Sequence, residues 1–193
     1  MDDNYIFHQT SRSLANRILK EGLKAGVDSR ENTVGNAYNK DTKNRERNSL
    51  FIKAEQILEE TRPKYYPKRG SVNYFFLEPL PNGYITSPLV DNLVVLRVDI
   101  EKIKNYTCYV GDFDVQGFEL KAAIDEGEPT DYSAKEMAEY YWERVEKHDK
   151  ISEVLQYQRG NYFEIPEVMI RSDIPAEAIE LVGEVVDGVL KEK

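Results

Sequence analysis

Two short segments at opposite ends of the chain carry the residue types best suited to chemistry. Near the N-terminus, His8, Gln9 and Thr10 follow an apolar run that begins at Tyr5. The ring nitrogens and the hydroxyl of such a segment can hydrogen-bond a polar ligand. A histidine satisfied within the core and a threonine that caps a helix would produce the same pattern. Taken alone, these three residues favour the structural interpretation.

The second segment is Ile165–Ile170, in which Glu167 is surrounded by apolar residues and directly follows Pro166. A carboxylate within a buried strand pays a desolvation cost unless it has a partner. Such groups are functional more often than surface acids are. The competing interpretation is an edge strand whose Glu167 faces water. The two interpretations are evenly matched from the residues alone.

A third candidate is Tyr74, which alternates with Val72 and Phe76 and should share one strand face with them. A tyrosine can stack on a flat cationic ring and donate from its hydroxyl. By itself this segment is best read as an ordinary aromatic strand.

The stretch from residue 62 to residue 70 joins cationic and aromatic side chains in a proline-containing loop. Such a surface can bind a nucleic acid through charge and stacking, although a solvated loop is the favoured interpretation. The residues concerned are Arg62, Lys64, Tyr65, Tyr66, Lys68 and Arg69.

Composition and missing motifs exclude several classes of protein. The net charge of −9 argues against a protein that coats nucleic acid by bulk electrostatics. With Cys108 as the only cysteine and two histidines, no disulfide, Cys-based zinc site or His-rich metal centre is expected. There is no phosphate loop and no Gly-x-Gly-x-x-Gly motif. An acidic N-terminus and no apolar run of about 20 residues predict a cytoplasmic protein without a membrane partner.

These candidates need an α+β scaffold to position them. Thr10 or Ser11 should cap a helix that Gly22 ends, and Ser133 with Glu136 forms a capping box for another helix. We therefore predict one domain, 1–193, with a mainly antiparallel sheet, flanking helices and a long polar loop at about 28–48. Strands are expected at 5–8, 72–77, 92–100, 106–110, 164–170 and 179–186, and helices near 11–21, 49–61 and from 134, with a terminal helix at 176–190 as an alternative to the last strand.

The order of these motifs resembles the His-Tyr-Glu branch of the ADP-ribosyltransferase superfamily, in particular its DarT-like and RNA 2′-phosphotransferase-like members. The His-x-Thr strand and its Ile-Leu-x-x-Gly-Leu helix come first. The basic loop and the Tyr-Phe strand follow, and the Pro-Glu-Val-x-Ile strand comes last, before an Ile-Pro-x-x-x-Ile turn.

The resemblance implies a split sheet in which His8 and Glu167, on neighbouring strands, face each other across an NAD cleft. It also implies that NAD is a co-substrate, that nicotinamide leaves and that ADP-ribose passes to a nucleic acid or a protein. A fixed carboxylate would stabilise the positive charge that develops on the ribose. The implied roles are catalysis by Glu167, ribose binding by His8, nicotinamide binding by the backbone of Gln9 with support from Thr10, stacking by Tyr74, and anion binding by Arg69.

Two positions depart from the pattern of that superfamily. Ile165 stands where arginine-modifying members have a second glutamate, which argues against that acceptor. Gln9 stands where many members have glycine, at the nicotinamide position. The same resemblance is therefore compatible with a non-catalytic nucleotide-binding or interaction module of this fold. An unrelated α+β interaction domain is the third reading.

Overall fold

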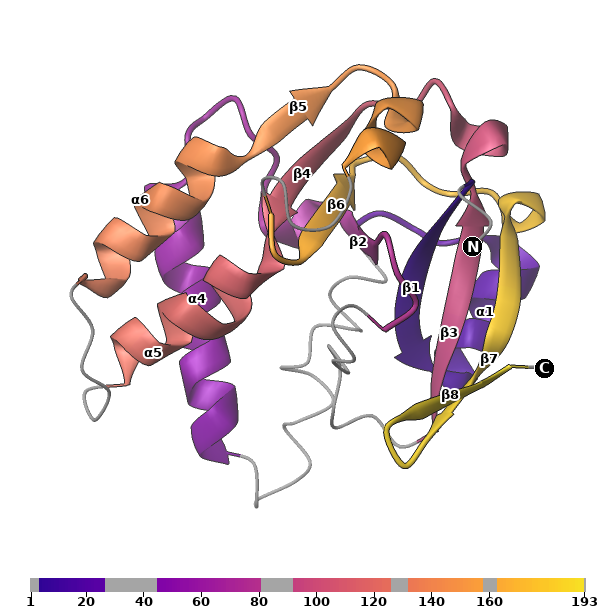
Figure 1. The fold of residues 1–193 in the computed structure, drawn as a ribbon, viewed down its shortest axis with the longest axis horizontal. Helices are drawn as coiled ribbons and strands as arrows, with labels where there is room; N and C mark the ends of the chain where they lie inside the picture. Colours follow the sequence, from indigo (N-terminus) through magenta and orange to yellow (C-terminus); the bar gives the residue numbers. More distant parts are fainter. Residues whose placement is uncertain (1–3, 27–44, 81–91, 126–131, 158–162, 193) are drawn as a thin grey trace.

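The computed structural model describes residues 4–26, 45–80, 92–125, 132–157 and 163–192. These residues form an α+β structure with a single antiparallel sheet, as the sequence predicted (Figure 1). Its strands are β1 (Tyr5–Ser11), β2 (Asn73–Phe76), β3 (Leu93–Asp99), β4 (Cys108–Asp112), β5 (Glu146–His148), β6 (Pro166–Ile170), β7 (Ile179–Val186) and β8 (Val189–Glu192). The α-helices are α1 (Arg12–Glu21), α4 (Arg45–Thr61), α5 (Leu120–Ile124) and α6 (Ala134–Arg144).

The sheet is divided between β1 and β2. Its strand order is β5-β4-β6-β2-β1-β3-β7-β8. Among the described residues, β1 and β2 share a single pair of facing residues, Phe7 and Phe76, whereas β1 pairs with β3 along its whole length. Figure 1 shows the two halves as separate groups of strands. The strands therefore diverge directly beside His8.

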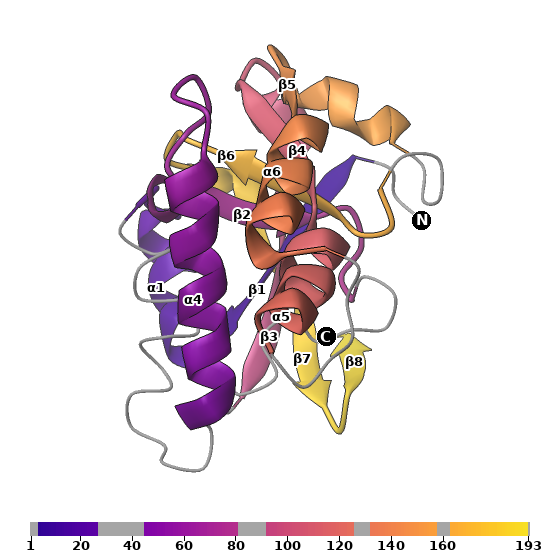
Figure 2. The ribbon, with the colours of Figure 1, turned by 90° about the vertical axis from the view of Figure 1, so that its left-hand side faces the viewer.

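Helices cover the two faces of the sheet differently. On one face, α1 packs through Ala15 and Ile18 onto a core that includes Phe75 and Val168. On the other face, α4, α5 and α6 surround a second core that includes Met169 (Figure 2). Val168 and Met169 are neighbours on β6 and enter different cores, because successive side chains of a strand point to opposite faces.

The Ile-Leu-x-x-Gly-Leu helix motif and the Ile-Pro-x-x-x-Ile turn motif meet just after the C-terminal end of α1. Leu23 and Ile174 exchange two backbone hydrogen bonds of 2.9 Å. Gly22 ends α1 with φ 84°, and a Cβ at this position would lie 2.4 Å from the Ile174 carbonyl oxygen. Glycine is thus required here by both backbone angle and space. Two of the motifs that carry the resemblance therefore have a structural explanation, because they supply Gly22, Leu23 and Ile174 to this contact.

Several predicted boundaries change. Helix α4 begins at Arg45, so the last part of the predicted 28–48 loop is helical; residues 27–44 lie outside the described residues. The cap of α1 is Ser11, whose Oγ accepts from the Leu14 amide at 3.3 Å, and not Thr10. The strands β1 and β2 also begin or end one to three residues away from the predicted limits.

The alternative of a terminal helix at 176–190 is wrong. The segment forms the hairpin β7–β8, joined by Asp187 and Gly188 with φ values of 51° and 78°. Two positive φ values match the two-residue turn that continues the twist of antiparallel strands. The Asp-Gly pair was the available signal for this turn.

Candidate functional site

All predicted site residues except Tyr74 are buried. In the described part of the chain the buried polar or charged side chains are His8, Gln9, Thr10, Arg69, Asn73, Asp112 and Glu167. The sequence analysis thus identified most of the polar groups that the fold takes out of water. The structure distributes them between the two faces of the sheet.

Glu167 lies at the centre of the sheet. Its strand, β6, runs between β2 and β4, so the edge-strand interpretation with a solvent-facing carboxylate is wrong. The residue is 3% exposed. Its Oε2 atom is 3.1 Å from Nη1 of Arg69 and accepts a hydrogen bond of 3.3 Å from the hydroxyl of Tyr141. Glu167 is therefore held inside the protein by a cation and a phenol.

Arg69 connects this carboxylate to α4. Its Nε atom lies 3.0 and 3.1 Å from the two carboxylate oxygens of Glu55, and its Nη1 donates to the Tyr141 hydroxyl at 2.6 Å. The Tyr74 hydroxyl donates to the Arg69 carbonyl at 2.6 Å, and the guanidinium carbon is 4.9 Å from the centroid of the Tyr74 ring. The side chain that was predicted to meet an anionic ligand is thus surrounded by the protein's own anions and rings. We call Glu55, Arg69, Tyr141 and Glu167 the buried charge cluster; the Glu55 side chain, at its edge, is 25% exposed.

The charges of this cluster do not balance, because one guanidinium faces two carboxylates. Burial raises the pKa of Glu167 above its ordinary value; Arg69 acts against this shift and Glu55 adds to it. Burial by itself lowers the pKa of Arg69, but the attraction of Glu55 and the other neighbours outweighs it and the pKa rises well above the usual range. Burial also raises the pKa of Tyr141 well above its ordinary value. Arg69 remains charged and Tyr141 remains a neutral donor.

Sequence reasoning missed Tyr141, Glu55 and a glycine that makes room for the cluster. Gly111 on β4 faces Glu167 in the sheet. A Cβ on Gly111 would lie 2.7 Å from the Tyr141 hydroxyl oxygen. A glycine inside a strand often marks the close approach of another group, so the Cys108–Asp112 strand carried a readable signal.

His8 lies on the other face of the sheet. Phe7, Phe76 and Glu167 form one row across β1, β2 and β6. The next residue along β1, His8, therefore points away from the face of Glu167. Its ring lies 5.7 Å from that of Phe75, and its Nδ1 is 2.9 Å from the Tyr74 carbonyl oxygen. Since a carbonyl can only accept, Nδ1 donates this bond.

The expectation that His8 and Glu167 face each other from neighbouring strands is therefore wrong. Strand β2 separates their strands, and the two side chains point to opposite faces of the sheet. Motif order along a chain does not specify register, and a shift of one residue moves a side chain to the opposite face.

Gln9 and Thr10 also occupy structural positions. The Gln9 amide donates to the carbonyl oxygen of Pro79 at 3.0 Å and so ties β1 to the segment after β2. Thr10 is buried and faces Val94 of β3 across the ladder.

The predicted basic and aromatic surface is divided between interior and exterior. Tyr66 stacks on Trp142 and donates to the Val145 carbonyl oxygen at 2.5 Å. Arg62 is half-buried and donates to the Tyr66 carbonyl oxygen at 2.7 Å. Together with buried Arg69, these residues do not belong to an exposed patch. The exposed members are Lys64, Tyr65 and Lys68, with Tyr65 74% exposed.

No protein-family model, curated protein or solved structure was found to match this chain. The likeness to ADP-ribosyltransferases consequently depends on the motifs in the sequence. Among the described residues, no three His, Cys, Asp or Glu side chains are grouped so that they could hold a metal ion. Within the same ranges, no helix is long and apolar enough to span a membrane.

Proposed function

We propose that this protein is a non-catalytic nucleotide-binding module of the ADP-ribosyltransferase type. The observation that carries this proposal is the position of Glu167, whose carboxylate is bound by Arg69 and Tyr141 at 3% exposure. A carboxylate that stabilises a developing charge on ribose must reach that sugar. Here the Oε2 atom of this carboxylate instead accepts from a guanidinium of the protein.

The position of His8 supports the same conclusion. The resemblance implies that His8 binds ribose beside Glu167. In the structure its ring lies on the opposite face of the sheet from Glu167, and its Nδ1 donates to the Tyr74 carbonyl oxygen. The motifs of the resemblance border the point at which β1 and β2 diverge, and this position supports nucleotide binding as part of the proposed function. NAD is the first ligand to test.

The test measures binding and turnover of NAD separately. We expect NAD to raise the melting temperature of the full chain in a saturable way, because a ligand that binds only the folded state stabilises it. We expect nicotinamide release at the rate of the buffer control. Absence of any thermal shift at millimolar NAD would contradict the nucleotide part of the proposal, and protein-dependent release of nicotinamide would contradict its non-catalytic part.

A second candidate is an NAD-dependent ADP-ribosyltransferase with Glu167 as the catalytic residue. The raised pKa of Glu167 favours it, since strongly perturbed carboxyl groups are concentrated at functional sites. In this reading Glu167 exchanges Arg69 for ribose hydroxyls when NAD binds. The acceptor would be a nucleic acid held by Lys64, Tyr65 and Lys68, or a protein.

Matched variants separate the two candidates. Glu164 is an exposed carboxylate on the segment that leads into β6 and provides the control. The transferase predicts nicotinamide release in the presence of RNA, DNA or protein acceptors, its loss in Glu167→Gln, and its retention in Glu164→Gln. The binding module predicts no release from any of the three proteins, with NAD-dependent stabilisation preserved in both variants.

A further inference from the structure

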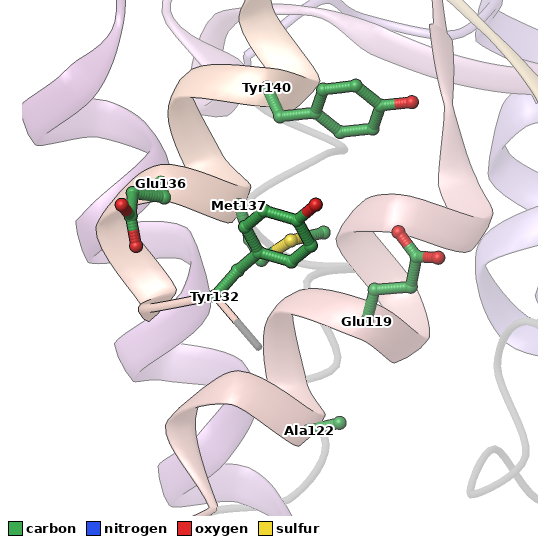
Figure 3. A pocket seen from close by; sticks show the side chains of 6 residues that line it. All are labelled: Glu119, Ala122, Tyr132, Glu136, Met137 and Tyr140. Carbon is green, nitrogen blue, oxygen red and sulfur yellow. The ribbon is translucent and has the colours of Figure 1, made fainter. Parts of the chain in front are cut away.

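A cavity of about 590 Å³ lies between α5 and α6 (Figure 3). It is separate from the buried charge cluster, although α6 contributes to both. Residues of both helices, of the turn before α5 and of the segment before α6 line it: Glu119, Ala122, Tyr132, Glu136, Met137 and Tyr140.

The walls of this cavity combine aromatic rings with a thioether. Tyr132 and Tyr140 are 60% and 42% exposed, so both rings are accessible to a ligand. In Figure 3 the Tyr132 ring is drawn in front of Met137, with Glu136 to the left and Glu119 to the right. Met137 is itself buried and joins the cavity floor to the core beneath α6.

The charge of the described lining is negative, since it contains two carboxylates and no lysine, arginine or histidine. The Glu136 carboxylate accepts hydrogen bonds from the Ser133 amide at 2.8 Å and from its hydroxyl at 2.7 Å, and these bonds lower the pKa of Glu136. Glu136 is therefore ionised at neutral pH, and its two bonds to Ser133 hold the carboxylate at the N-terminal end of α6.

One cation of the protein already uses a ring of this cavity. The Arg144 guanidinium lies 5.3 Å from the centroid of Tyr140 and donates to its hydroxyl at 2.5 Å. Arg144 also lies 3.8 Å from Asp112, which draws it toward β4. The Tyr140 ring thus already takes part in one cation–π contact at the rim of the cavity.

The backbone before α5 has a special form at the cavity. Residues Val115–Glu119 form a π-helical turn that ends at the lining residue Glu119. A Cβ on Gly117 would lie 2.9 Å from the Phe113 ring, so the packing of this turn depends on glycine. π-Helical turns are rare and are often found at functional sites.

We propose that the α5–α6 cavity binds a small organic cation with methyl or alkyl groups on nitrogen. The rings of Tyr132 and Tyr140 and the Met137 thioether would surround the alkyl groups, and Glu119 and Glu136 would offset the charge. A mainly apolar cavity with a few fixed polar groups is the usual form of a small-molecule site. This site is independent of the function proposed for Glu167.

The experiment compares choline with 3,3-dimethylbutan-1-ol, which has the same shape without the charge. Titration of the full chain is followed by NMR chemical-shift changes and calorimetry. Choline should bind several-fold more tightly than the neutral alcohol, because the latter lacks the cation–π and carboxylate terms. Equal affinity of the two probes, or no binding of choline at tens of millimolar, would overturn the proposal.

Variants locate the binding to the cavity. Tyr132→Leu keeps an apolar wall without the ring and should weaken choline binding by about two- to fivefold. Glu119→Gln should weaken it while leaving the neutral alcohol unaffected. Glu139→Gln is the control, since Glu139 lies on α6 outside the lining and pairs with Lys135 at 3.6 Å. Equal effects of the Glu119 and Glu139 substitutions would overturn the assignment.

A final comparison separates this inference from the function proposed above. Glu167→Gln lies outside the cavity and should leave choline affinity unchanged, whatever it does to NAD binding. A loss of choline affinity in that variant would show that the two sites are one, contrary to the inference.

Discussion

The two faces of the sheet treat buried polar groups in different ways. On the face covered by α4, α5 and α6, Glu167 belongs to a cluster of full charges with Arg69 and Glu55. On the face covered by α1, His8 donates a hydrogen bond to the Tyr74 carbonyl oxygen and lies beside the Phe75 ring. Polar residues that one family resemblance groups together can therefore contribute very differently to the free energy of unfolding when the register places them on opposite faces of the sheet.

The difference has a physical origin in the neighbours of each group. A buried charge requires other charges and donors close to it, because its hydration is lost. The Glu167 face supplies them from α4, which carries Glu55, from α6, which carries Tyr141, and from the segment before β2, which carries Arg69. A histidine that can be neutral requires only a hydrogen bond, and the divergence of β1 from β2 provides an acceptor in the Tyr74 carbonyl.

The largest expected effect is that of Arg69→Met, which removes the cation between two carboxylates. We expect the free energy of unfolding to fall by about 3–5 kcal/mol, because uncompensated charge stays buried. Urea denaturation measures this fall in the free energy of unfolding. Lys68→Met, an exposed neighbour, is the control and should change stability by less than about 0.5 kcal/mol. Similar losses of unfolding free energy in both variants would contradict the large stabilisation that we assign to the charges around Glu167.

The next effect tests the space that β4 leaves for Tyr141. Gly111→Ala should lower the free energy of unfolding by about 1–3 kcal/mol, because the added Cβ meets the Tyr141 hydroxyl. The cost should be smaller when the same change is made in Tyr141→Phe, which lacks that oxygen. Gly70→Ala is the control, since nothing lies within 4 Å of a Cβ at Gly70. Identical costs of Gly111→Ala in both backgrounds would rule out this contact as the cause.

A smaller effect is expected on the α1 face. His8→Leu removes the donor to the Tyr74 carbonyl oxygen and should cost about 1 kcal/mol, the usual net value of such a bond. His8→Asn, which keeps a donor on a shorter side chain, should retain part of the stability. A loss of unfolding free energy as large as that of Arg69→Met would contradict the expected difference in stabilisation between the two faces.

The smallest effect concerns the pH dependence of Glu167. Because its pKa in the folded protein lies above the ordinary value of 4.5, the folded state binds more protons than the unfolded state from that pH up to the raised pKa. The stabilisation from this group is complete below pH 4.5 and is lost as the pH rises through the folded-state pKa. The stability of the wild type relative to Glu167→Gln should therefore decline over this range. Denaturation curves at several pH values measure the decline, with Glu164→Gln as the control; a difference that grows with pH would reverse the assigned shift.

Much of the scaffold was predictable because its signals are local. The Ser133–Glu136 capping box, the glycine that ends α1 and the apolar strand before Ile100 each specify a structure through neighbouring residues. For Glu167 the residues alone left burial and a solvent-facing edge position evenly matched, and the structure decides for burial. The Asp187–Gly188 turn could have decided between hairpin and helix.

The composition of the site was less predictable because its contacts are distant in sequence. Arg69 reaches Glu167 across 98 positions and Tyr141 across 72. Neither Tyr141 nor Glu55 belongs to a motif that marks it in advance. Only packing of α4 and α6 on the sheet brings these residues to the loop that carries Arg69.

The sequence by itself determined which strands carry the candidate polar residues, His8, Thr10 and Glu167 among them, because local apolar patterns and capping residues specify strands and helices. Only the tertiary structure decided which of them share a layer and which atoms they bind. The physical reason is that side chains alternate along every strand, and the one row that joins β1 to β2 pairs Phe7, and not His8, with the face of Glu167.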